Sequence, residues 1–94
     1  MKTYTVEVDD DGSKFWYLNG KRHREDGPAM VYSNGDKFWY LNGEYHREDG
    51  PACEWVDGTK EWYIDGKELA EAEFNNRNDK TIVIDGITYK LVKV

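Results

Sequence analysis

The chain has 94 residues, of which 13 are Lys or Arg and 19 are Asp or Glu, giving a net charge of −6 at pH 7. This length predicts a single small domain, residues 1–94, burying only ~60–65% of its unfolded surface. The acidic balance argues against direct nucleic-acid binding, because phosphate-binding surfaces need clustered Lys and Arg. It favours another protein as the partner, and it permits that protein to be basic or nucleic-acid-binding.

The first eleven residues are predicted to form an N-terminal strand and a turn. From Met1 to Val8, apolar Tyr4, Val6 and Val8 alternate with Thr and Glu, the period-two pattern of a half-buried edge strand. The acidic run Asp9–Gly12 lacks the spacing and the later Glu of a calcium-binding loop. We therefore predict a solvated turn here.

The middle of the chain repeats itself. The stretch from Gly12 to Asn34 recurs 23 residues later, and a third, worn copy runs from Gly58 to Gly66. Such self-similarity indicates a repeat architecture, in which no single unit can bury its own apolar face. Residues 12–66 are therefore expected to form three stacked repeats, and the fold class is mainly β, built from antiparallel β-hairpin repeats.

Each repeat is predicted to contain two antiparallel strands. The first strands end in Asn-Gly or Asp-Gly, pairs that favour the positive φ angles of tight turns. The second strands follow Gly-Pro, where Gly permits a left-handed turn and Pro starts a strand without donating to the ladder. The predicted first strands are Lys14–Leu18, Lys37–Leu41 and Lys60–Ile64, and the second strands are Ala29–Tyr32 and Ala52–Trp55.

Alternation along the first strands separates two faces. The Trp face is apolar in all three copies and is predicted to be the core; it holds Trp16, Leu18, Trp39, Leu41, Trp62 and Ile64. The opposite face, which we call the Phe/Tyr face, holds Phe15, Tyr17, Phe38, Tyr40 and Tyr63. In the third copy Glu61 takes the place of Phe on this face, and an unpaired charge is rarely buried. The Phe/Tyr face is therefore predicted to be partly exposed to solvent and to carry the residues that bind a partner. Cys53, the single Cys, is predicted to be a small buried hydrophobe.

The pattern changes after Gly66. Lys67–Phe74 contains strong helix formers and no β-branched residue, which predicts a short helix. Residues 75–79 are predicted to end this helix and form a loop, so that the segment 67–79 is a short helix followed by a loop. Residues 80–94 are predicted to form a hairpin around Asp85-Gly86, with Ile84 opposite Ile87. We expect this hairpin to cap the edge of the repeat sheet.

The core of the repeat, Asn19-Gly20-Lys21-Arg22-His23, resembles MORN repeats, and Asn42 to His46 matches less well. Arg24–Pro28 and Arg47–Pro51 depart from the family, in which Gly-x-Gly follows the His. This variant is similar to short proteins of tailed phages and to some bacterial antitoxin-like proteins. Over Gly12 to Gly66 the resemblance implies stacked β-hairpins and a protein-binding role, with no implied chemistry.

The repeated His-Arg-Glu-Asp string is the one sequence that suggests catalysis, with His as a base, Arg as an anion clamp and two acids as a proton or metal site. Because the string recurs in phase with the repeat, a turn motif is the simpler interpretation. Asp26 and Asp49 would then cap backbone N–H groups, and Arg24 or Arg47 would pair with a nearby acid.

A metal site at His23 and His46 is the next possibility. Equivalent backbones of successive repeats should lie ~9.6 Å apart, two strand spacings. The remaining ligands would be carboxylates, whereas zinc prefers more His or Cys. We expect no metal and no cofactor.

The sequence therefore predicts a non-catalytic protein-binding module rather than an enzyme. The resemblance suggests a phage or mobile-element accessory protein that binds and inhibits a host factor, for example a defence protein. A small enzyme or ligand-binding protein using the His-Arg-Glu-Asp rim, or a purely structural repeat protein, remains the alternative, and a homodimer is left open. The predicted partner-binding residues are Phe15, Tyr17, Phe38, Tyr40, Tyr63, His23, Arg24, His46 and Arg47.

The location expected from the sequence is the cytoplasm, or the host cytoplasm if the protein is phage-encoded. The chain carries no signal-peptide pattern and no apolar run of membrane-spanning length. No membrane association is expected.

Overall fold

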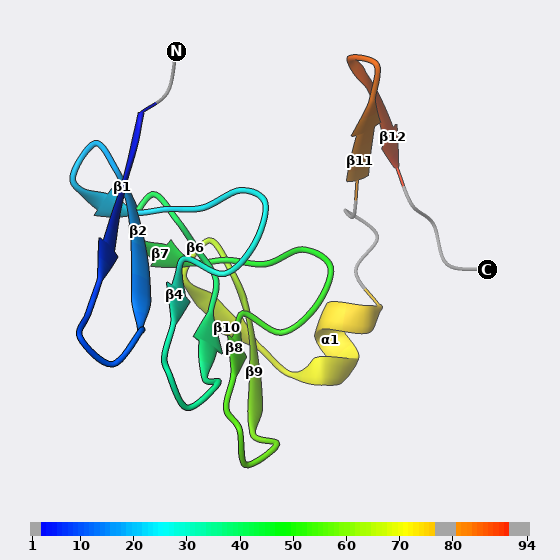
Figure 1. The fold of residues 1–94 in the computed structure, drawn as a ribbon. Helices are drawn as coiled ribbons and strands as arrows, with labels where there is room; N and C mark the ends of the chain where they lie inside the picture. Colours follow the sequence, from blue (N-terminus) through cyan, green and yellow to red (C-terminus); the bar gives the residue numbers. More distant parts are fainter. Residues whose placement is uncertain (1–2, 77–80, 91–94) are drawn as a thin grey trace.

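The computed structural model describes residues 3–76 and 81–90. It confirms the predicted class, because the described chain is mainly β, with antiparallel strands and one short helix (Figure 1). The elements are β1 (Tyr4–Val8), β2 (Lys14–Leu18), β3 (Lys21–Arg22), β4 (Met30–Val31), β5 (Lys37–Phe38), β6 (Tyr40–Leu41), β7 (Glu44–Tyr45), β8 (Cys53–Glu54), β9 (Lys60–Ile64), β10 (Lys67–Leu69), α1 (Glu71–Asn75), β11 (Thr81–Ile84) and β12 (Ile87–Lys90).

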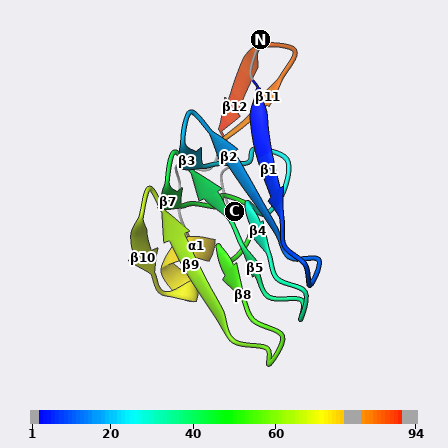
Figure 2. The same ribbon diagram turned by 60° about the vertical axis from the view of Figure 1, so that its left-hand side comes forward.

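The main sheet is an antiparallel meander in the order β1-β2-β4-β5-β8-β9-β10, with β3 paired to β2 (Figure 2). The predicted N-terminal strand is confirmed for Tyr4–Val8, which pairs with β2 so that Val6 lies opposite Trp16. Met1 and Lys2 lie outside the described residues. Asp9–Gly12 forms the predicted turn, in which the N–H of Gly12 donates to the carbonyl of Asp9.

The tight turns of the first strands are confirmed. Asn19, Asn42 and Asp65 have φ angles of 53°, 51° and 50°, and the glycine after each also has a positive φ. A two-residue turn with both φ angles positive reverses the chain immediately. The strands β3, β7 and β10 therefore follow these turns directly, although the sequence pattern predicted the next strand only after Gly-Pro. The predicted second strands are present but shorter, as β4 and β8.

The hairpins after these turns are joined to one another by backbone hydrogen bonds. The N–H of Gly43 donates to the carbonyl of Arg22 at 2.8 Å, and the N–H of Gly66 donates to the carbonyl of Tyr45 at 2.9 Å. In the second copy the predicted strand Lys37–Leu41 is interrupted at Trp39, between β5 and β6. Each long strand therefore contributes its first part to the main sheet and its second part to the row of hairpins.

The core lies on the face opposite to the one predicted. The registers of the main sheet align Phe15, Met30, Phe38, Cys53 and Glu61 in one cross-strand row. Within this row Met30 is 6% exposed, Phe38 8% and Cys53 1%. Burial of Cys53 was predicted correctly. Phe38, predicted to be displayed, instead lies at the centre of the core.

The hairpins explain why the Phe/Tyr face is covered. They carry Tyr40 and Tyr45 against the row, with ring centroids 4.5 Å apart, and Tyr45 lies 6.3 Å from Phe38. Phe15 and Tyr63 also pack against this core. Glu61 is the last residue of the row, on β9. Its charge therefore lies where the core ends and does not indicate that the whole Phe/Tyr face is exposed to solvent.

The predicted helix is shorter than expected. Lys67–Leu69 forms β10, because the Asp65-Gly66 turn folds this segment back onto β9, where Leu69 lies opposite Trp62. Strand pairing overrides the helix propensity of these three residues. The helix α1 follows at Glu71–Asn75. No helix among the described residues has the length and apolar character needed to span a membrane.

The C-terminal hairpin has the predicted register, with Ile84 opposite Ile87. It forms a separate two-stranded sheet and does not pair with β10, the last strand of the main sheet (Figure 1). Ile84 and Ile87 are both exposed. The hairpin therefore does not cap the repeat sheet as predicted.

We predict that Phe38→Ala lowers the free energy of unfolding by ~3–5 kcal/mol, because it removes a large ring from the centre of the core. Val8→Ala is the control, since Val8 is an exposed residue at the sheet edge, and it should change stability by less than ~0.5 kcal/mol. Urea denaturation followed by circular dichroism measures both. Equal stability of the two variants would contradict this assignment of the core.

Candidate functional site

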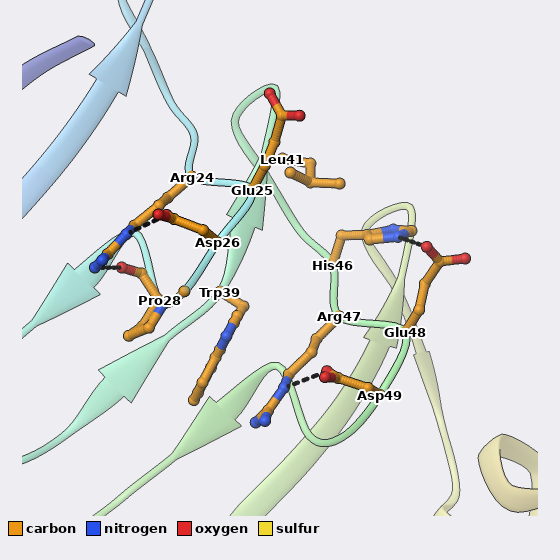
Figure 3. A pocket seen from close by; sticks show the side chains of 11 residues that line it. Arg24, Glu25, Asp26, Pro28, Trp39, Leu41, His46, Arg47, Glu48 and Asp49 are labelled. Carbon is orange, nitrogen blue, oxygen red and sulfur yellow. Dashed lines mark hydrogen bonds and ion pairs between the residues drawn. The ribbon is translucent and has the colours of Figure 1, made fainter. Parts of the chain in front are cut away.

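The two His-Arg-Glu-Asp strings lie in the loops that connect β3 to β4 and β7 to β8. We call residues 23–28 loop 1 and residues 46–51 loop 2. Both loops lie against the Trp face of the main sheet (Figure 3). Their contacts recur with the period of the sequence, so each residue of the string can be assigned a physical role.

The Arg of each loop covers the Trp of its own repeat. The Cζ atom of Arg24 lies 4.0 Å from the centroid of Trp16, and that of Arg47 lies 3.8 Å from the centroid of Trp39. At this distance a guanidinium stacks on the indole and makes a cation–π interaction. The Trp side chains are therefore half-buried under the loops, rather than forming the core as predicted.

Each guanidinium is also bonded within its loop. Arg24 donates from Nε to Asp26 Oδ1 at 2.8 Å and from Nη1 to the carbonyl of Pro28 at 3.2 Å. Arg47 makes the same two bonds, to Asp49 at 2.9 Å and to the carbonyl of Pro51 at 3.0 Å. The predicted pairing of Arg with a nearby acid is confirmed. The carboxylates of the two Asp residues accept these bonds from Arg, in place of the predicted caps on backbone N–H groups.

The charge of Arg24 affects its partner. Its hydrogen bond and its positive charge hold the pKa of the Asp26 carboxyl below the usual value. Asp26 therefore stays ionised to a lower pH than an unpaired carboxyl does, and the Arg24–Asp26 pair has no net charge at neutral pH.

The glycine of each loop makes room for the guanidinium. A Cβ at Gly27 would lie 3.0 Å from Cζ of Arg24, and a Cβ at Gly50 would lie 2.9 Å from Cζ of Arg47. Neither glycine has a positive φ angle, so the left-handed turn expected at Gly-Pro is not present. A side chain at either position would press on the guanidinium, so these glycines leave the space that the stacked arginine fills.

Each His connects its repeat to the next one. His23 is 6% exposed, and its Nδ1 accepts from the N–H of Asn42 at 2.9 Å. The ring proton then lies on Nε2, which is 3.1 Å from Glu25 Oε2. His46 repeats the arrangement: Nδ1 accepts from the N–H of Asp65 at 2.9 Å, and Nε2 lies 3.8 Å from Glu48. Both imidazoles therefore fix the tight turn of the following repeat.

The third copy has no such loop, and α1 takes its place. Phe74 of α1 is 2% exposed, and its ring centroid lies 6.5 Å from that of Trp62. The first turn of the helix is fixed by Glu73, whose side chain accepts from the N–H of Ala70 at 3.0 Å. The helix thus closes the Trp face where the repeat pattern ends.

Loops 1 and 2 enclose a groove of about 520 Å³ (Figure 3). Its floor is Trp39 and Leu41, and we call it the Trp39 groove. Its rim carries the acids Glu25, Asp26, Glu48 and Asp49. The Glu side chains are about half exposed (51% and 56%), and the Asp side chains are 85% and 86% exposed.

A second groove of about 350 Å³ lies on the other side of loop 1, and we call it the Trp16 groove. It is lined by Tyr4, Trp16, Arg24, Glu25 and Asp26. Glu25 and Asp26 therefore belong to both grooves, and loop 1 is their common wall.

The predicted binding residues are divided between two places. Arg24, His46 and Arg47 line the Trp39 groove, whereas His23 is buried and lines neither groove. Phe15, Phe38, Tyr40 and Tyr63 belong to the core on the opposite face, and Tyr17 lies in β2, half-buried. The groove floor and the rim acids were not predicted as binding residues. The recurrence of Glu-Asp beside each His-Arg pair was the available signal.

The described residues contain no cluster of three or more His, Cys, Asp or Glu side chains arranged to hold a metal ion. Burial raises the pKa of the Cys53 thiol to about 12, which keeps it protonated and unreactive at neutral pH. The chain matches no family model, no curated protein and no solved structure.

We predict that the Nδ1 acceptor of His23 accounts for most of its contribution to stability. His23→Gln should lower the free energy of unfolding by ~1–3 kcal/mol, because the N–H of Asn42 loses its partner. His23→Asn should lose less, since its side-chain oxygen can take the position of Nδ1. Urea denaturation compares them, and an equal loss in both variants would refute the acceptor role.

We predict that Gly50→Ala destabilises the protein through Arg47. The added Cβ displaces the guanidinium, so the substitution should cost ~1–3 kcal/mol alone and much less in the Arg47→Ala background. Gly58→Ala is the control: Gly58 has a φ angle of 94° and open space around it, so its cost should add to that of Arg47→Ala. Additive behaviour of Gly50→Ala in this double-mutant cycle would be the contrary result.

Proposed function

We propose that this protein is a non-catalytic module that binds another protein through the loop face of its repeats. The observation that carries the proposal is the Trp39 groove, which combines an apolar floor with a rim of exposed carboxylates. Binding sites commonly join an apolar surface to a few placed polar groups. The groove walls are held by bonds within each loop, so the surface is formed before a partner arrives.

The use of the loop side chains supports binding over catalysis. His23 has both ring nitrogens engaged, and Arg24 is held by Trp16 and Asp26. A general base needs a nitrogen or oxygen directed at a substrate proton, and neither ring nitrogen of His23 is available for this. The contacts of His23 and Arg24 shape loop 1, and this structural use supports the binding proposal.

The charges of the groove favour a basic partner. Arg24 is paired with Asp26, and Arg47 is paired with both Asp49 and Glu54. The lining of the groove includes four acids and two arginines, so carboxylates outnumber guanidiniums there. A carboxylate rim attracts Lys and Arg side chains and repels phosphate backbones. We therefore propose a basic protein segment as the partner, consistent with the net charge of −6.

The origin of the protein, the identity of its partner and its location in the cell are also proposals. A MORN-like origin, inhibition of a host defence protein and a cytoplasmic location rest on the resemblance and composition described above. Among the aromatic residues, Tyr40 now belongs to the core, so its substitution should act through stability before binding. The loop face replaces the Phe/Tyr face as the proposed contact surface.

We predict that peptides selected from a random 12-residue display library against the wild-type protein bind at the groove. Glu25→Gln/Glu48→Gln should weaken them at least about tenfold, because two charges of the rim are removed. Glu7→Gln/Asp10→Asn is the matched control, with the same change in net charge at exposed residues of β1 and its turn. Fluorescence titration measures the affinities, and thermal melting verifies folding. Equal weakening by both pairs, or by neither, would refute the proposed surface.

A further inference from the structure

We infer that the two grooves together bind a polyproline II segment carrying Lys or Arg at every third residue. This inference rests on the proposed function and specifies the chemistry of its partner. It depends on three features of the described chain: the spacing of the grooves, their lining and the wall that they share.

The spacing of the grooves matches a polyproline II helix. Trp16 lies on β2, Trp39 follows β5, and only β4 lies between these strands in the sheet. Two strand spacings place equivalent positions ~9.6 Å apart. A polyproline II helix rises ~3.1 Å per residue with three residues per turn, so residues i and i+3 lie on one side, ~9.3 Å apart.

Other backbone conformations fit less well. An extended strand brings side chains to the same side every ~6.8 Å, which does not reach from one groove to the next. An α-helix offers i and i+7 at ~10.5 Å, but with its ~10 Å diameter its axis would lie further from the groove floors than that of a polyproline II segment crossing loop 1. A polyproline II segment is thin enough to cross loop 1, and such segments commonly dock on aromatic-lined grooves.

The lining of each groove suits a long cationic side chain. In the Trp39 groove, the methylene stem can lie on Leu41 and on the part of Trp39 that lines the groove beside the stacked Arg47 (Figure 3). The charged group would then meet Glu25 and Glu48 at the rim. In the Trp16 groove, the rings of Tyr4 and Trp16 provide the apolar surface beside Arg24. Glu25, whose Oε2 accepts from the Tyr4 hydroxyl at 3.1 Å, again provides charge.

Loop 1 couples the two grooves. Because Glu25 and Asp26 line both of them, two cationic side chains of one peptide would lie on either side of the same pair of carboxylates. The Trp of the third copy, Trp62, is covered by Phe74 of α1. The described residues therefore offer two adjacent grooves, and the expected ligand has two basic residues spaced by three.

Three synthetic peptides of equal length and Pro-rich background test this inference by isothermal titration with the wild-type protein. The first carries two Lys residues three positions apart, the second carries them two positions apart, and the third carries a single Lys. The first should bind at least about tenfold more tightly than the others, because its second Lys binds at high effective concentration. Equal affinity of the first and second peptides, or no binding by the first, would overturn the inference.

Two variants locate the binding of the first peptide. Glu25→Gln should reduce its affinity more than Glu48→Gln does, since Glu25 lines both grooves and Glu48 lines one. Gln keeps an acceptor for His23, and thermal melting verifies that each variant is folded. Equal losses of affinity in the two variants would contradict the conclusion that Glu25 contributes to both grooves.

Selection from the random peptide library distinguishes two outcomes: the polyproline II inference can be wrong while the proposed binding surface is right, or both can be wrong. If the selected peptides depend on Glu25 and Glu48 but lack basic residues three apart, the polyproline II inference is wrong and the proposed binding surface stands. Selected helical peptides with basic residues seven apart would also overturn the inference and leave the surface standing. If no selected peptide depends on these residues, the proposed function fails as well.

Discussion

The stacking of an arginine on a tryptophan is the contact on which the loop face depends. On the Trp face of this small sheet, Trp16 and Trp39 are covered by Arg24 and Arg47 of their own loops. A guanidinium can lie flat on an indole while its donors remain bonded to a carboxylate and a carbonyl. The sheet thereby covers its tryptophans with a charged group that keeps its hydrogen bonds.

That contact explains the composition of the repeated string. Arg stacks, Asp and the Pro carbonyl hold its donors, and Gly leaves the space that the guanidinium fills. His performs a different task, because its Nδ1 accepts a backbone N–H from the turn of the next repeat. Each copy thus closes its own loop and depends on its neighbour for the tight turn, as expected for a stack of small units.

The groove is a consequence of the same bonds. Because the arginines are paired internally, the two loops stand as fixed walls whose exposed groups are carboxylates. The space between them opens onto Trp39 and Leu41. The interactions that stabilise the loops also decide the charge that the loops present to a partner, which connects the stability of the repeats to the function proposed for them.

The sequence alone determined the features that depend on local geometry. The 23-residue period, the tight turns at Asn19, Asn42 and Asp65, and the register of the C-terminal hairpin follow from turn chemistry and alternation. Burial of Cys53 was also predictable from its place in the pattern. These properties need only neighbouring residues, since a turn with two positive φ angles fixes the strands on either side of it.

Tertiary structure decided which face became the core. Both faces of the first strands are apolar, and the choice depends on hairpins from other repeats that bring Tyr40 and Tyr45 over Phe38. Pairing with β9 likewise made Lys67–Leu69 a strand against its helix propensity. The Trp39 groove exists only where two loops, 23 residues apart in the sequence, stand side by side. The Trp16 groove likewise requires Tyr4 of β1 beside loop 1. No local pattern encodes these outcomes, because each depends on contacts between distant segments of the chain.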